Sequence, residues 1–132
     1  MKRTVNLTTH QTKELQEITP LIREELRKAS WKNGILMLFV PHTTAAVTIN
    51  ENADPDVCTD LVYALKHAFP QHPAFHHIEG NSDAHVMTSL TGSSELIIVE
   101  NGQLVLGTWQ GIYLAEYDGP RRRSLHLKFI EG

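Results

Sequence analysis

The chain has one cysteine, no long apolar run and no excess of basic residues, and each absence excludes a class of protein. One cysteine cannot form an intrachain disulfide or a cysteine-based zinc site. The longest uninterrupted apolar run covers residues 35–40, far short of the roughly 20 residues that a membrane-spanning helix needs. The first residues contain no apolar signal-peptide region. We therefore expect a cytoplasmic protein that does not enter membranes.

The charge balance argues against a nucleic-acid partner. Lys and Arg number 12 against 15 Asp and Glu, which gives a net charge of −3, whereas nucleic-acid binders carry a basic excess. The 132 residues contain 41% hydrophobic residues, enough for one core. No linker, repeat or low-complexity tract interrupts them. We expect a single domain over residues 1–132.

Apolar periodicity predicts an α+β fold with two or three helices and six or seven mostly antiparallel strands. The expected strands cover 2–9, 35–40, 45–50, 96–99, a return strand from 104, 112–117 and 125–130, and the later helices cover 55–68 and 84–91. The apolar runs 35–40 and 96–99 predict strands covered on both faces. The first helix starts either at Thr19-Pro20 or near residue 12 with a bend at Pro20, and Asn33-Gly34 ends that region. Its apolar stripe is Leu15, Ile18, Ile22 and Leu26.

Histidine is the residue type that stands out, with eight copies. His42 follows a predicted strand, and His77 and His85 flank a Gly-Asn-Ser turn that lets them fold back on one centre. Three protein ligands with an open position are typical of a catalytic metal. The alternative is that each histidine is an ordinary surface residue. We favour that interpretation for the remaining ones, His10, His67, His72, His76 and His126.

Three acidic residues have two interpretations each. Glu51 and Asp54 lie at the chain reversal after His42, where they could return to its side as general bases. Alternatively, Asp54 caps the helix that begins at Pro55, and Glu51 complements its dipole. Asp83 either caps the following helix or accepts a hydrogen bond from a ligating imidazole.

Two segments suggest an anionic ligand. Residues 89–94 place Gly92 among hydroxyls, which predicts either an anion-binding turn or an ordinary one. Arg121 and Arg123 share one face of a strand, and Arg122 takes the other. Arginine matches phosphate geometry, although a solvated charge run is the alternative. Cys58 lies beside an apolar helical stripe, so we expect an inert thiol.

Five segments together carry a resemblance to a known family over nearly the whole chain. They are Pro41-His42-Thr43-Thr44-Ala45, residues 50–55, residues 79–85, Leu106-Gly107-Thr108-Trp109-Gln110 and Asp118-Gly119-Pro120-Arg121. In these segments the chain resembles the YjbQ-like family, whose members are described as secondary thiamine-phosphate synthase enzymes. The resemblance implies an α+β fold with a mixed, strongly curved sheet, a homotrimer, and a pocket that combines histidine metal ligands with polar and arginine residues.

By position, the resemblance assigns His42, His77 and His85 as metal ligands, with His76 as a rival to its neighbour His77. It assigns substrate binding to Asn81, Arg121 and Arg123. The implied reaction joins a pyrimidine diphosphate to a thiazole phosphate with loss of pyrophosphate. Such chemistry ordinarily uses Mg²⁺ on oxygen ligands, whereas three histidines favour Zn²⁺. We therefore expect a metal-dependent enzyme acting on small phosphorylated substrates, with thiamine-phosphate synthesis as its main or a side activity. The alternative is a non-catalytic oligomer that binds a metal or an anionic metabolite.

Overall fold

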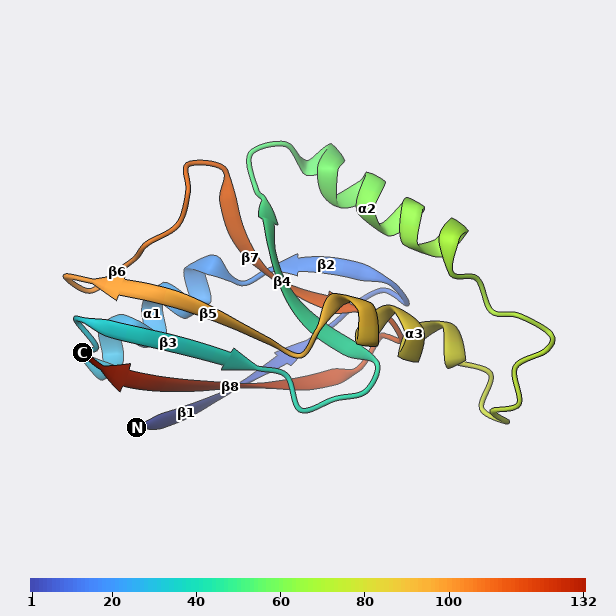
Figure 1. The fold of residues 1–132 in the computed structure, drawn as a ribbon, viewed down its shortest axis with the longest axis horizontal. Helices are drawn as coiled ribbons and strands as arrows, with labels where there is room; N and C mark the ends of the chain where they lie inside the picture. Colours follow the sequence, from blue (N-terminus) through green and yellow to red (C-terminus); the bar gives the residue numbers. More distant parts are fainter.

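The computed structural model describes residues 1–132 and contains eight strands and three helices (Figure 1). In chain order the elements are β1 (Lys2–Thr8), β2 (Glu14–Glu17), α1 (Thr19–Ala29), β3 (Gly34–Phe39), β4 (Ala45–Glu51), α2 (Pro55–Ala68), α3 (Ser82–Thr91), β5 (Ser94–Glu100), β6 (Gln103–Leu104), β7 (Gln110–Glu116) and β8 (Arg122–Glu131).

The strands form two sheets rather than one mixed sheet. One sheet has the order β1-β8-β3-β5-β6 and the other the order β2-β7-β4. Every strand pair is antiparallel. The predicted α+β class and the antiparallel character are confirmed, and β1 lies at an edge of the larger sheet.

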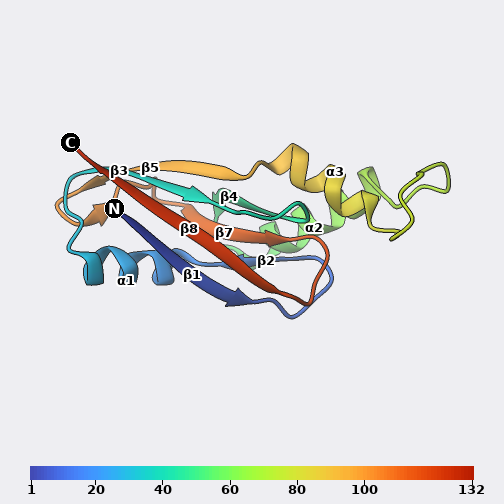
Figure 2. The same cartoon turned by 90° about the horizontal axis from the view of Figure 1, so that it is seen from below.

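The main core lies between the two sheets and α1. The inward side chains Leu36 and Leu38 of β3 meet Leu114 of β7 and Ile22 of α1 in one buried cluster. Figure 2 shows α1 on the inner side of the strands, with no helix over the outer side of β3 and β5. One face of the larger sheet is therefore bare within a single chain.

That bare face corrects the expectation that the strands at 35–40 and 96–99 are covered on both sides. Alternate residues of each strand are exposed, and the pairing register places them on one face because directly opposed residues point the same way. We call this set the outer apolar face; its members and their exposed fractions are Ile35 44%, Phe39 40%, Leu96 65%, Ile98 55% and Ile130 58%.

The first helix begins where the Thr19-Pro20 signal placed it and not near residue 12. Leu15 belongs to β2, so its helical spacing from Ile18 was coincidental. Thr19 does not cap the helix; its hydroxyl accepts a hydrogen bond from Ile112 N–H (2.8 Å) and ties α1 to β7. The helix ends at Ser30, which has left-handed φ, rather than at Asn33-Gly34.

The other two helices follow the sequence closely. Asp54 caps α2 by accepting a hydrogen bond from Asp56 N–H (2.9 Å). Although the stripe of α2 is apolar, none of its residues is fully buried. The third helix, α3, begins after Asn81 and ends at Gly92. None of the helices is both long and apolar enough to span a bilayer.

Candidate functional site

Three separate chain segments meet at one end of the fold, where the β3–β4 loop, α3 and the β7–β8 turn enclose a hollow. Its volume is about 410 Å³, and Pro41 is the only apolar residue in its lining. We call it the histidine pocket; its lining residues are Pro41, His42, Thr43, Thr44, His77, Glu79, Asn81, His85, Asp118, Arg121 and Arg123.

The pocket brings together the three histidines that the sequence selected. The rings of His77 and His85 lie edge to face with centroids 5.5 Å apart. His42 is half-buried, and its Nε2 accepts a hydrogen bond from Ser124 N–H of β8 (2.9 Å). Burial, assisted by the charge of Arg123, lowers the pKa of His42 below its ordinary value. A lowered pKa favours the neutral imidazole, which is the form that binds metals.

The donor set of the pocket fits zinc in chemistry, because Zn²⁺ accepts imidazole nitrogen readily. The side chains as placed do not converge: no group of three or more histidine, cysteine or carboxylate side chains has a metal-holding arrangement. The Nε2 lone pair of His42 is occupied by Ser124 N–H. Coordination through that nitrogen would require this hydrogen bond to break.

A buried ion pair forms the floor of the pocket. Glu116 of β7 is fully buried and Arg123 of β8 is 4% exposed. Arg123 Nε donates to Glu116 Oε1 (2.8 Å), and its Nη2 donates to Glu116 Oε2 and to Thr44 Oγ1 (2.8 Å). Burial alone would raise the pKa of Glu116, but hydrogen bonds from Arg123, Asp118 N–H and Thr9 hold that pKa below its usual value. The guanidinium therefore holds the loop that carries His42.

Arg121 is the exposed cation of the pocket. Its Nη2 lies 3.0 Å from Asp118 Oδ2, and about half of its side chain is accessible. Asp118 Oδ2 also accepts from Asn81 Nδ2 (2.9 Å), which leaves Asn81 Oδ1 buried without a partner. The hydrogen bonds from Asn81 and Arg121 outweigh burial and lower the pKa of Asp118. The result is a fixed cluster of Asn81, Asp118 and Arg121 beside the imidazoles.

Glu51 and Asp54 do not line the pocket. Glu51 is the last residue of β4 and Asp54 follows that strand, so β4 carries both away from His42 (Figure 1), by about 20 Å at the usual rise of a strand. The carboxylates that do line it are Glu79 and Asp118. The catalytic part predicted for Glu51 and Asp54 stays a prediction.

Candidate residues that are adjacent in the sequence differ in whether they line the histidine pocket. His77 lines the pocket, whereas His76 is exposed and does not. Arg121 and Arg123 both line it and Arg122 does not, as strand alternation predicted. Asp83 neither caps α3 nor reaches an imidazole; it lies in the first turn of the helix and pairs with Lys13 (3.0 Å).

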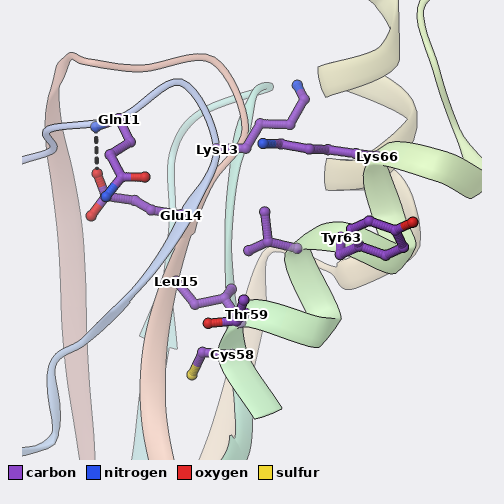
Figure 3. Close-up of a pocket in the computed structure, with 9 residues that line it drawn as sticks. Gln11, Lys13, Glu14, Leu15, Cys58, Thr59, Tyr63 and Lys66 are labelled. Carbon is purple, nitrogen blue, oxygen red and sulfur yellow. Dashed lines mark hydrogen bonds between the residues drawn. The ribbon is translucent and has the colours of Figure 1, made fainter. Parts of the chain in front are cut away.

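A second hollow, of about 380 Å³, lies between β2 with its preceding loop and α2 (Figure 3). Cys58 lines it and is half-buried, more accessible than expected. Lys13 and Lys66 also line it, but Lys13 Nζ is already committed to Tyr117 O (2.7 Å) and to Asp83. This hollow shares no residue with the histidine pocket.

Three pocket-forming residues escaped the sequence analysis as site residues: Glu79, Asp118 and Glu116. Asp118 precedes Arg121 by three residues, a spacing that suits a local ion pair. Glu116 sits in an apolar strand, and a carboxylate within such a strand indicates a buried partner. That signal was present in the sequence.

Comparison with other proteins gives the chain a family. The family model described as "UPF0047 protein YjbQ-like" matches residues 3–132. The chain belongs to the YjbQ-like UPF0047 family. A UPF0047 protein of Methanocaldococcus jannaschii is 51% identical over 122 residues, covering 92% of this chain and 88% of that protein. The UPF0047 protein YugU of Bacillus subtilis is 43% identical, covering 98% and 99%.

Solved structures of the family have the same fold. A YjbQ/UPF0047 protein from Clostridium acetobutylicum superposes with a TM-score of 0.93 at 47% identity, covering 97% of this chain and 99% of that one. A hypothetical protein from Aeropyrum pernix gives a TM-score of 0.94 at 33% identity, covering 100% and 99%. A further member, from Sulfolobus solfataricus, is described as being of unknown function. Sequence and structure therefore agree on the family, and the descriptions of these relatives name no activity.

Proposed function

We propose that the histidine pocket is the active site of a metal-dependent enzyme that acts on small phosphorylated substrates. The observation that carries this proposal is the gathering of three imidazoles, an exposed arginine and an unpartnered amide oxygen in one polar hollow of about 410 Å³. Ligand sites of this kind combine a concave shape with a few convergent polar groups. Thiamine-phosphate synthesis, implied by family resemblance, is the first activity to test, as a main or side reaction.

Arg121 binds the anionic group of the substrate in this proposal. Asp118 fixes its guanidinium by accepting from Nε and Nη2, and Nη1 keeps its donors free in a residue that lines the pocket. Asn81, at the N-terminal end of α3, lies beside it, and the partial positive charge of a helix N-terminus favours an anion there. Arg123 and Glu116 act beneath the pocket by holding the loop of His42 in place.

His42, His77 and His85 would hold the metal, with Zn²⁺ favoured over Mg²⁺ because the ligands are nitrogen. When bound, such an ion polarises a substrate oxygen or lowers the pKa of a water molecule. The lowered pKa of His42 favours its neutral ring, and a metal bound at Nε2 would replace the hydrogen bond that this nitrogen accepts from Ser124 N–H. The carboxylate of Glu79 lies 3.8 Å from His77 Nε2, which is too far for a hydrogen bond but places a negative charge beside that ring.

The test combines metal content with turnover. Wild type and His85→Ala are purified without added metal and assayed for condensation of the pyrimidine diphosphate with the thiazole phosphate. We expect His85→Ala to lose both metal and turnover, and the matched control His76→Ala to keep both. Undiminished turnover in folded, metal-free His85→Ala would overturn the mechanism.

One observation favours the second candidate, a non-catalytic protein that binds a metal or an anionic metabolite. The carboxylates proposed as general bases lie outside the pocket, and Asp118 is engaged by Arg121 and Asn81. Binding of phosphorylated compounds without turnover across a broad panel would support this candidate. Turnover above background on any compound would exclude it.

The assembly that we propose is a homotrimer in the cytoplasm, without nucleic-acid or membrane partners. Its support is the outer apolar face, where five large apolar side chains are each at least 40% exposed. An apolar patch of this kind marks an interface, and a second copy of the chain is the partner that the family resemblance implies. Light scattering coupled to gel filtration measures the mass directly.

A further inference from the structure

A smaller hollow of about 260 Å³ adjoins the histidine pocket at the end of α3. It shares His42, Thr43 and His85 with that pocket. Its other lining residues come from the last turn of α3 and the chain after it: Thr88, Ser89, Gly92 and Ser93. Apart from the two imidazoles, nothing in this lining can carry a charge. We call it the hydroxyl hollow.

The hydroxyl groups of this hollow are unused by the fold. Thr88 is 6% exposed, and its Oγ1 is buried with no hydrogen-bond partner. The hydroxyls of Thr43, Ser89 and Ser93 also make no hydrogen bond within the chain. The other buried threonines differ from Thr88, because the hydroxyls of Thr9, Thr19 and Thr44 all pair within the protein. Buried polar groups are normally paired, so the unpaired Oγ1 of Thr88 indicates a missing ligand or water. The hydroxyls of Thr43 and Ser89 are exposed, and that of Ser93 is half-buried, so all three are open to the same ligand.

The direction of α3 gives the two hollows opposite electrostatic character. The helix has ten residues. It starts after Asn81 in the histidine pocket and ends at Gly92 in the hydroxyl hollow. Its dipole places partial positive charge at the first end and partial negative charge at the second. Gly92 N–H is consumed by Thr88 O (2.9 Å). The segment 89–94 therefore presents the carbonyl end of α3, and Gly92 N–H is not free to bind an anion.

We infer that the hydroxyl hollow is a second subsite, which binds the uncharged, hydrogen-bond-donating end of a substrate whose anionic end lies at Arg121. This inference rests on the proposed function, since it extends the same site. The seven steps along the chain from His85 to Gly92, at the C-terminal end of α3, span about 10 Å at the helical rise. The substrate class is therefore an elongated monophosphate or diphosphate with a neutral polar end, and compounds with an anionic group at both ends are disfavoured.

Three probes of graded structure test the subsite by isothermal titration calorimetry on the protein as purified. They are inorganic phosphate, pentyl phosphate and ribitol 5-phosphate; the last two have the same five-carbon chain and differ in their hydroxyls. We expect ribitol 5-phosphate to bind more tightly than pentyl phosphate, by roughly 3- to 10-fold for each hydrogen bond gained.

Variants assign the binding energy to each hollow. Thr88→Val and the double variant Ser89→Ala/Ser93→Ala should weaken ribitol 5-phosphate to the level of pentyl phosphate and leave inorganic phosphate unchanged. Because the hydroxyl of Thr88 is unpaired in the free protein, Thr88→Val should not lower the melting temperature. Ser94→Ala, next to the hollow but outside its lining, is the control. Arg121→Gln should weaken all three probes, and Arg122→Gln should weaken none.

The outcomes separate the two proposals. If ribitol 5-phosphate and pentyl phosphate bind wild type equally, or if the hydroxyl variants affect all three probes alike, the subsite is refuted while the anion site stands. If no probe binds wild type, or if Arg121→Gln changes none of the affinities, the proposed phosphate site itself fails and the subsite falls with it.

Discussion

Replacing Glu116 by Gln probes the buried ion pair under the histidine pocket. Glu116 is fully buried at the end of β7, and Arg123 at the start of β8 is only 4% exposed. The carboxylate accepts from Arg123 twice, from Thr9 Oγ1 (2.7 Å) and from Asp118 N–H (2.9 Å). Glutamine keeps the shape but leaves the guanidinium charge buried without its counter-charge.

The expected loss of stability is large. Removing one partner of a buried ion pair costs about 3–5 kcal/mol, because the other charge stays desolvated and unpaired. For a domain of this size, each kcal/mol lowers the melting temperature by roughly 3–5 °C. We therefore expect Glu116→Gln to melt about 10–20 °C below wild type. Arg123→Met should cost a similar amount, since it leaves the carboxylate buried among fewer donors.

The double variant Glu116→Gln/Arg123→Met decides whether the pair is the cause. Urea unfolding followed by circular dichroism gives the free energy for all four proteins of the cycle. We expect the double variant to be clearly more stable than the sum of the two single losses predicts, because it contains no unpaired charge. A cost below about 1 kcal/mol for Glu116→Gln, or strict additivity in the cycle, would refute the reasoning.

Three further changes have defined outcomes. The folded-state pKa values of Glu116 and Asp118 lie below their ordinary ones. The stability that these carboxylates contribute is therefore complete above their unfolded-state pKa and is lost as the pH falls through the folded-state pKa. Melting temperatures measured from pH 7 to pH 3 should show this loss, and the loss should be smaller in Glu116→Gln. Leu96→Asp on the outer apolar face should reduce the mass measured by light scattering from trimer to monomer, whereas the exposed polar control Glu100→Lys should not. Gly34→Ala should destabilise the chain by about 2–4 kcal/mol in urea unfolding, because φ is +156° and a Cβ would collide with the carbonyl oxygen of Ile130; a variant as stable as wild type would contradict the packing of β3 against β8.

Local signals in the sequence were sufficient for most of the elements. Asp54-Pro55 determines the start of α2 because a cap and a proline act on neighbouring backbone groups only. Apolar spacing, which is also a local signal, failed at Leu15, because this residue continues the helical stripe in sequence but lies on β2. The burial of individual strand faces could not be predicted for another reason. An apolar run predicts a strand that is buried on both faces, but it does not say whether residues of the same chain bury both of them.

The site shows why nearness along the chain is a poor guide to nearness in space. Glu51 follows His42 by nine residues, yet the seven-residue strand β4 carries it to the opposite end of the sheet. Arg123 is 81 residues from His42, yet the antiparallel pairing of β3 with β8 places it directly beneath the loop of that histidine. Strand ends that meet at one edge assemble a site, whereas the two ends of one strand cannot. An acidic residue can therefore lie beside His42 only if its segment returns to the same edge of the sheet. Asp118, which follows the end of β7, satisfies that condition.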